Sequence, residues 1–94
     1  MREIVRKRIL FTGRVQGVGF RWLARHAAEA LGLTGWVRNE YDGSVTMEIQ
    51  GIEAGIDRLL AELSSGRYID IQHVEIRKIA VDEEERSFRV RGIE

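Results

Sequence analysis

The chain has 94 residues, of which 44% are apolar, and its 15 basic and 15 acidic side chains give a formal net charge of zero. This length allows a single domain, residues 1–94, with one core, and the balanced charge excludes the broad electrostatic attraction of a nonspecific nucleic-acid binder. Cysteine is absent, which excludes disulfides, thiolate metal sites and a cysteine nucleophile.

The first two predicted elements are a strand and a helix. Residues 5–15 predict a strand, because apolar and polar side chains alternate there, with Arg14 on the polar face. Residues 20–31 predict a helix, because their apolar positions recur at helical spacing and Gly32 follows where a C-cap is expected. Arg14 is therefore expected to point away from the core.

Between these elements, residues 13–21 read Gly-Arg-Val-Gln-Gly-Val-Gly-Phe-Arg. Gly17 and Gly19 can adopt backbone conformations that a Cβ would forbid, so consecutive N–H groups can turn towards one small anion. The start of the helix adds unpaired N–H donors, and Arg21 in its first turn can hold two phosphate oxygens at once. The pattern predicts a phosphate-binding loop that consists of Val15, Gln16, Gly17, Val18, Gly19, Phe20 and Arg21.

An ordinary strand-to-helix turn, with Arg21 in solvent, is the alternative interpretation of residues 13–21. A lone glycine-rich loop is a weak signal, so the residue pattern alone favours neither interpretation. The loop lacks the Gly-Lys-Ser/Thr ending of a Walker loop and the three spaced glycines of a dinucleotide-binding loop. Neither of these two nucleotide-binding loops is therefore present.

Two further strands and a second helix follow. Residues 33–40 and 44–50 predict strands, joined by a hairpin turn at 41–43 that contains the favoured Asp-Gly pair. Apolar residues at helical spacing from residue 52 predict a second helix, which ends before Gly66.

The last part of the sequence predicts an irregular strand and a short final strand. The apolar parity changes between Ile71 and Val74, so a bulge or loop is expected near Gln72. Strands are predicted over about 73–81 and over 87–91. The order β-α-β-β-α-β, closed by a short strand, is that of the ferredoxin-like split βαβ fold. We therefore predict an α+β sandwich, with an antiparallel sheet and two helices on one face.

This topology brings Asn39 to the glycine-rich loop. The first strand runs up to the loop, the helix returns, and the second strand runs up again, so Asn39 at its end lies at the same end of the molecule. By the alternation of a strand, Asn39 shares a face with apolar Val37, which is the helix side, whereas Arg38 points to the opposite face. The alternative role for Asn39 is that of a turn residue bonded to its own backbone.

The motifs in their order resemble the acylphosphatase family, over a stretch from about Ile9 to the C-terminus. The similarity is carried by the residues at 13–21, by Gly-Trp-Val-Arg-Asn at 35–39 and by Gly-Ser-Val at 43–45. The resemblance implies hydrolysis of the carboxyl–phosphate bond of acyl phosphates, with the phosphate-binding arginine at Arg21 and the water-orienting asparagine at Asn39. It also implies that no metal or organic cofactor takes part. The segment 65–71 departs from the Gly-Pro-rich loop of many members.

Other candidates for chemistry are weak. His26 and His73 have no partners at the spacing of a triad or a metal site, so both are expected on the surface. The acidic run 82–85, Glu48 and Glu53 are expected to be solvated. Trp36 is expected to be a packing residue or part of a covered surface, and not a platform for stacking.

Two other classes of function are weighed against an enzyme. An RNA-binding module is disfavoured, because the strand at 44–50 has no aromatic residue on which a base could stack. A domain that binds acyl phosphate or carbamoyl phosphate without turnover stays open, although the end of the chain at Glu94 favours a free-standing enzyme. No apolar run is long enough to span a membrane and the N-terminus lacks the apolar core of a signal peptide, so the cytoplasm is the expected location.

The expected ligands are an acyl phosphate substrate and phosphate or sulfate as a competitor. No nucleic acid, membrane or obligate protein partner is expected, and no cofactor.

Overall fold

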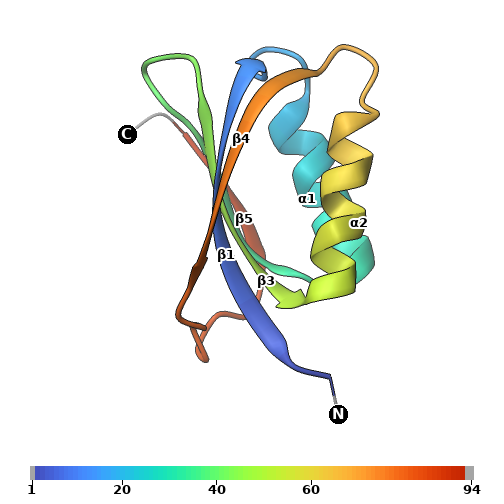
Figure 1. Ribbon diagram of the computed structural model, residues 1–94, viewed down its shortest axis with the longest axis vertical. Helices are drawn as coiled ribbons and strands as arrows, with labels where there is room; N and C mark the ends of the chain where they lie inside the picture. Colours follow the sequence, from blue (N-terminus) through green and yellow to red (C-terminus); the bar gives the residue numbers. More distant parts are fainter. Residues whose placement is uncertain (1, 93–94) are drawn as a thin grey trace.

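Residues 2–92, the part of the chain that the computed structural model describes, form five strands and two helices in the predicted order (Figure 1). In chain order the elements are β1 (Ile4–Arg14), α1 (Phe20–Leu31), β2 (Thr34–Asn39), β3 (Val45–Ile52), α2 (Glu53–Ser64), β4 (Asp70–Ile79) and β5 (Phe88–Arg91).

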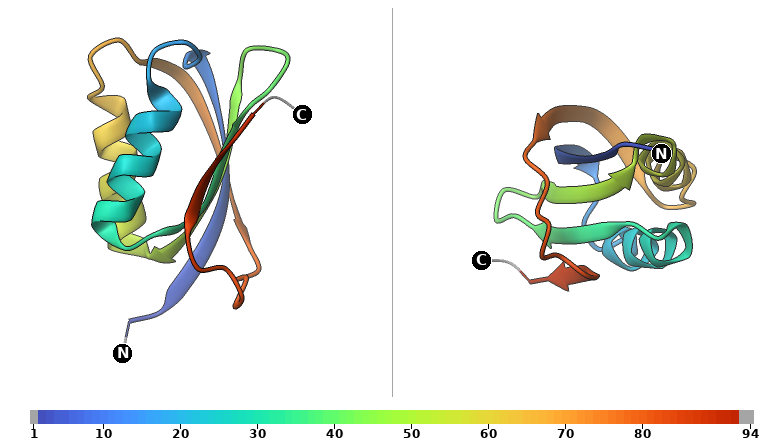
Figure 2. Two further views of the ribbon diagram at one scale, coloured as in Figure 1. Left: turned by 180° about the vertical axis from the view of Figure 1, so that it is seen from behind. Right: turned by 90° about the horizontal axis from the view of Figure 1, so that it is seen from below.

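The strands form one sheet in the order β4-β1-β3-β2-β5. The first four strands are antiparallel to their neighbours, as predicted, whereas β5 lies parallel to β2, so the sheet is mixed. The reason is the path of residues 80–87, which leave β4 at the end of the molecule away from the glycine-rich loop and cross the sheet there (Figure 2). The chain therefore enters β5 at the end where β2 begins, and both strands run in one direction.

Both helices cover the same face of the sheet, as predicted (Figures 1 and 2). The alternation of the strands and the 3.6-residue period of the helices direct one apolar set from each layer into the space between them. Neither helix within residues 2–92 is long and apolar enough to cross a membrane. The largest fully buried side chains are Phe11, Phe20, Ile9, Met47, Ile49, Ile56, Leu59, Leu63, Val15, Val37 and Val45.

The irregularity predicted near Gln72 is a bulge in β4. Thr12 pairs with His73, but the next residue of β1, Gly13, pairs with Ile71, so Gln72 is an extra residue on β4. In a regular strand Ile71 and Val74 would lie on opposite faces, because they are three positions apart. The extra residue at the bulge places both on the face that the helices cover.

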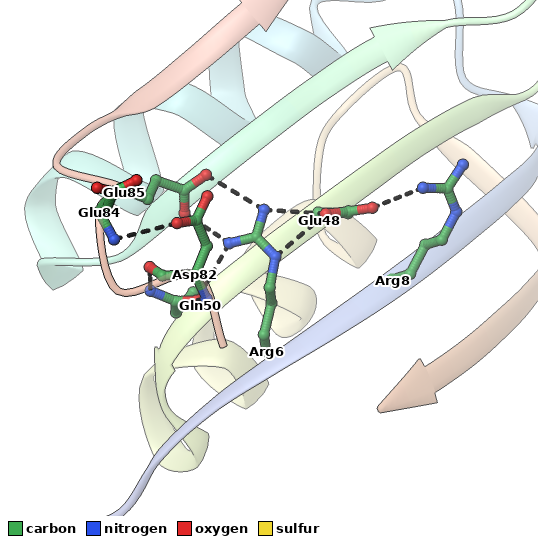
Figure 3. A network of polar contacts seen from close by, with 7 residues as sticks. All are labelled: Arg6, Arg8, Glu48, Gln50, Asp82, Glu84 and Glu85. Carbon is green, nitrogen blue, oxygen red and sulfur yellow. Dashed lines mark hydrogen bonds and ion pairs between the residues drawn. The ribbon is translucent and has the colours of Figure 1, made fainter. Parts of the chain in front are cut away.

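The sheet face without helices carries a buried polar network centred on Arg6 (Figure 3). The Arg6 side chain is only 5% exposed and donates to Glu48 at 2.9 Å, to Glu85 at 2.7 Å and to Gln50 at 3.1 Å. Burial by itself lowers the pKa of Arg6, but the hydrogen bonds to Glu85 and Glu48 outweigh it and the net pKa is raised.

The expectation that Glu48 and the acidic run 82–85 are solvated is therefore wrong for Glu48 and Glu85. Their side chains are 16% and 14% exposed, because each pairs with a guanidinium that the sheet buries. Trp36 lies on the same open face, where the guanidinium groups of Arg38 and Arg91 each lie 4.9 Å from its ring centroid. This agrees with its expected role as a packing residue.

Replacing Arg6 with methionine should destabilise the fold by about 3–5 kcal/mol, because it leaves Glu48 and Glu85 without their shared cation and removes the tie between residues 80–87 and β1. The matched control is Arg58→Met, whose ion pair with Glu62 has side chains 69% and 40% exposed. The control should change stability by no more than about 0.5 kcal/mol. Urea unfolding of both variants tests this, and equal small effects would show that the network adds nothing to stability.

Candidate active site

The loop between β1 and α1 has the backbone conformation that its glycines predict. Gly17 has φ of 70° and Gly19, the residue before α1, has φ of 80°, both in the left-handed region. A Cβ at either position would meet no atom within 4 Å, so the requirement for glycine comes from the backbone angle and not from crowding.

This conformation leaves a run of backbone donors unpaired. The N–H of Val15 donates to Gly13 O at 3.1 Å, and the N–H of Leu23 donates to Gly19 O at 2.9 Å. Between them, the N–H groups of residues 16–20 have no acceptor within residues 2–92. Unpaired N–H groups at the start of a helix, where the helix dipole is positive, are an arrangement that favours a bound anion.

Arg21 extends from the first turn of α1 towards the end of β5. Its Nη1 donates to Arg91 O at 2.6 Å, which fixes the guanidinium across the space between the helix and the sheet. Nη2 and Nε have no acceptor within residues 2–92, so the three N–H groups on these two nitrogens stay available to a ligand.

Asn39 is the last residue of β2 and pairs with Val45 of β3. Its side chain faces the helix side, as the strand alternation predicts. The Asn39 Oδ1 atom is buried and has no hydrogen-bond partner within residues 2–92. An unpaired buried carbonyl costs about 1–3 kcal/mol, so the environment of Asn39 favours a bound group that donates a hydrogen.

These groups line one open pocket of about 360 Å³. Five of the seven predicted loop residues line it together with Asn39, whereas Gln16 and Val18 do not. Two cationic side chains, Arg21 and Arg25, are part of the lining, and no acidic or histidine side chain is. The lining residues are Val15, Gly17, Gly19, Phe20, Arg21, Trp22, Arg25, Asn39 and Val90.

Sequence reasoning missed three of these residues. Arg25 lies four positions after Arg21 and three after Trp22, so helical periodicity could have indicated Arg25 as a neighbour of Arg21. Trp22 directly follows Arg21 and gives no such signal. Val90 could not have been found in this way, because its place depends on the parallel pairing of β5 with β2.

The Gln16 side chain leaves the pocket and joins the loop to the hairpin between β2 and β3. Its Nε2 donates to Glu40 O at 2.7 Å and to Ser44 O at 2.8 Å. The loop residue therefore contacts the segment that directly follows Asn39.

Two carboxylates of the same hairpin are held in the ionised form. The Thr46 hydroxyl, followed by the Arg38 guanidinium, lowers the pKa of Glu40. The Ser44 hydroxyl and N–H lower the pKa of Asp42. Neither carboxylate lines the pocket, so neither competes with an anion bound there.

The remaining candidates lie elsewhere. His26 is exposed and stacks on Trp22, with ring centroids 5.1 Å apart, and the His73 side chain is 64% exposed. Within the described residues, no group of three or more His, Asp or Glu side chains could hold a metal ion. Arg38 lies on the open face, where it pairs with Glu40 at 3.0 Å, and Arg14 is exposed, so both point away from the pocket as predicted.

The family model and the curated relatives agree on one family. The acylphosphatase family model matches residues 7–90. An acylphosphatase of Koribacter versatilis is 46% identical over 87 residues, which cover 92% of this chain and 79% of that protein.

Solved structures agree with the sequence comparison. An acylphosphatase from Coxiella burnetii superposes with a TM-score of 0.84 at 35% identity, covering 94% of this chain and 93% of that one. Full-length HypF, in a phosphate- and nucleotide-bound form, superposes with a TM-score of 0.88 at 28% identity, over 99% of this chain and 12% of that one. With a family model that matches most of its length and relatives of this identity, the chain belongs to the acylphosphatase family.

Proposed function

We propose that this chain hydrolyses the carboxyl–phosphate bond of acyl phosphates to a carboxylate and inorganic phosphate. In this proposal the N–H groups of residues 16–20 and the Arg21 guanidinium hold the phosphoryl group, and the Asn39 side chain orients the attacking water. The observation that carries the proposal is the meeting of unpaired N–H groups, a cationic fork and an unpartnered carbonyl oxygen in one pocket.

The phosphate half of the site works through positioning and charge. In phosphoryl transfer negative charge is spread over three equatorial oxygens, so donors fixed around them stabilise the transition state with little covalent chemistry. The left-handed Gly17 and Gly19 shape the loop for this task, and the hydrogen bond from Arg21 to Arg91 O holds the guanidinium before substrate arrives.

The water half of the site works through Asn39. A water that donates one hydrogen to Asn39 Oδ1 satisfies that buried oxygen. The same hydrogen bond fixes the orientation of the water, so that a lone pair can point at the phosphorus. In-line attack on phosphorus requires such a fixed nucleophile on the side opposite the leaving oxygen.

The leaving group needs no acid from the protein. The conjugate acid of a carboxylate leaving group has a pKa of about 4, so the group departs as an anion at neutral pH. This matches a pocket whose lining has no carboxylic acid or histidine that could donate a proton.

Activity should survive chelation of metal ions. The charge on the phosphoryl group is neutralised by Arg21 and by backbone dipoles, so phosphate release from acetyl phosphate or benzoyl phosphate is expected at the same rate with and without EDTA. Phosphate release measured in both conditions tests the proposed function as a whole. Activity that is lost with EDTA and restored by magnesium would contradict the proposal that Arg21 and backbone dipoles neutralise the phosphoryl group without a metal ion.

Binding of acyl phosphate or carbamoyl phosphate without turnover is the second candidate function. The observation in its favour is that the same fold forms a 12% portion of full-length HypF, whose structure is a phosphate- and nucleotide-bound form. The same assay separates the two. A chain that binds phosphate at residues 16–20 but releases none from any acyl phosphate would be a binding domain.

A further inference from the structure

The two halves of the pocket come from strands that are not neighbours in the sheet. The loop at 15–19 follows β1, Asn39 ends β2, and β3 lies between the two strands. Backbone pairing therefore links the loop to Asn39 only indirectly, through a third strand. In-line attack depends on the distance between the bound phosphoryl group and the water on Asn39. The rate of hydrolysis therefore depends on how firmly the loop and Asn39 are held relative to each other.

Gln16 provides a direct link. Its Nε2 lies 2.7 Å from Glu40 O and 2.8 Å from Ser44 O, and both contacts are partly buried. Two carbonyl oxygens around one atom require a donor with two hydrogens, so the amide orientation is fixed by chemistry. Ser44 O also accepts from Glu40 N at 2.9 Å, so Gln16 donates to a carbonyl oxygen of each of the two residues that this hairpin hydrogen bond joins.

The position of this link matters because, within residues 2–92, strand pairing holds the end of β2 on one side. The parallel pairing with β5 reaches Arg38 opposite Arg91 and stops there, whereas pairing with β3 continues to Asn39 opposite Val45. Glu40, whose carbonyl Gln16 fixes, is the residue directly after Asn39. Within residues 2–92, the two Gln16 bonds are the side-chain hydrogen bonds between the loop and the hairpin.

We infer that Gln16 is a positioning residue, whose side chain sets the distance between the phosphate-binding loop and the Asn39 amide. This rests on the proposed function of Asn39. The backbone N–H of Gln16 belongs to the phosphate-binding loop, but its side chain acts through the hairpin and touches neither phosphate nor water. Misplacing a reacting group by about 1 Å can cost about 10²-fold in rate, which sets the size of the expected effect.

The test is a double-mutant cycle with Asn39. Gln16→Ala should lower kcat by about 10- to 100-fold, with KM and the inhibition constant of inorganic phosphate changed by no more than about threefold. In an Asn39→Ala background the same change should lower kcat by less than about twofold, because the group that Gln16 positions is gone. Gln16→Glu places a carboxylate against two carbonyl oxygens and should be at least as harmful. The matched control is Gln72→Ala, an exposed glutamine in the β4 bulge, which should leave kcat unchanged.

An equal fold-loss in both backgrounds, or a parallel loss of phosphate affinity, would overturn the inference. A second readout needs no activity: the side-chain NH₂ resonances of Asn39 in a ¹⁵N-labelled protein should shift or broaden in Gln16→Ala and stay in place in Gln72→Ala. Unmoved Asn39 resonances in Gln16→Ala would also overturn it. A wild-type chain that hydrolyses no acyl phosphate would instead contradict the proposed function. The Asn39 resonances would in that case still show whether the Gln16 side chain positions Asn39.

Discussion

Replacing Arg21 with alanine should lower kcat/KM for an acyl phosphate by about 10³-fold, and phosphate should become a much weaker inhibitor. In the proposed mechanism the guanidinium pairs with the phosphoryl oxygens in substrate and transition state alike, so its loss should affect affinity and turnover together. Removing one fixed donor to a developing oxyanion costs about 10²–10³-fold, and a phosphate-binding arginine can be worth more. Steady-state kinetics with benzoyl phosphate, with phosphate as inhibitor, measures both effects.

Two variants define what Arg21 contributes. Arg21→Lys keeps the charge but lacks the planar fork, so it should recover only part of the activity. Arg14→Ala removes an exposed arginine that points away from the pocket, and its effect should be mild. An Arg21→Ala protein that keeps its phosphate inhibition constant would show that the arginine does not hold the phosphoryl group.

Replacing Asn39 with alanine should lower kcat by about 10²- to 10⁴-fold, which is typical for the loss of a positioned catalytic group. The fold should not lose stability, because the change removes a buried oxygen that has no partner within residues 2–92. Urea unfolding and turnover measured on the same preparation separate this prediction from general damage. Near-normal turnover would refute the water-orienting role.

The neighbour Arg38 supplies the control for Asn39. Its side chain lies on the opposite face of β2, 4.9 Å from the Trp36 ring centroid, so Arg38→Ala should have a mild effect on turnover. A large loss in Arg38→Ala would mean that the end of β2 is sensitive to any change, and the effect at Asn39 would then not be specific.

Local signals in the sequence predicted most of the fold and most of the residues that line the candidate pocket. The helix over 20–31 was predicted with its observed bounds, because its apolar period is regular and Gly32 follows it directly. The face of Asn39 follows from the two-residue period of a strand. The bulge at Gln72 follows from a change of apolar parity that no regular strand can accommodate.

Features that depend on contacts between distant residues could not be predicted. The burial of Glu48 and Glu85 depends on Arg6, which lies 42 and 79 positions away and meets them through strand pairing and the crossing of residues 80–87. The parallel direction of β5 likewise depends on the path of residues 80–87 across the sheet, which no local signal indicates. The reach of the Gln16 side chain to the hairpin spans 24 and 28 positions and carries no periodic signal in the sequence.

The most direct test of the account is the dissociation constant of inorganic phosphate in wild type, Arg21→Ala and Asn39→Ala, followed through the ¹⁵N-labelled backbone amides. Saturable shifts are expected at residues 16–20 in wild type. Phosphate binding should stay within about twofold of wild type in Asn39→Ala and should weaken by at least about tenfold in Arg21→Ala. Shifts centred elsewhere, or phosphate affinity lost equally in both variants, would contradict the division of the site into a phosphate-binding half and a water-orienting half.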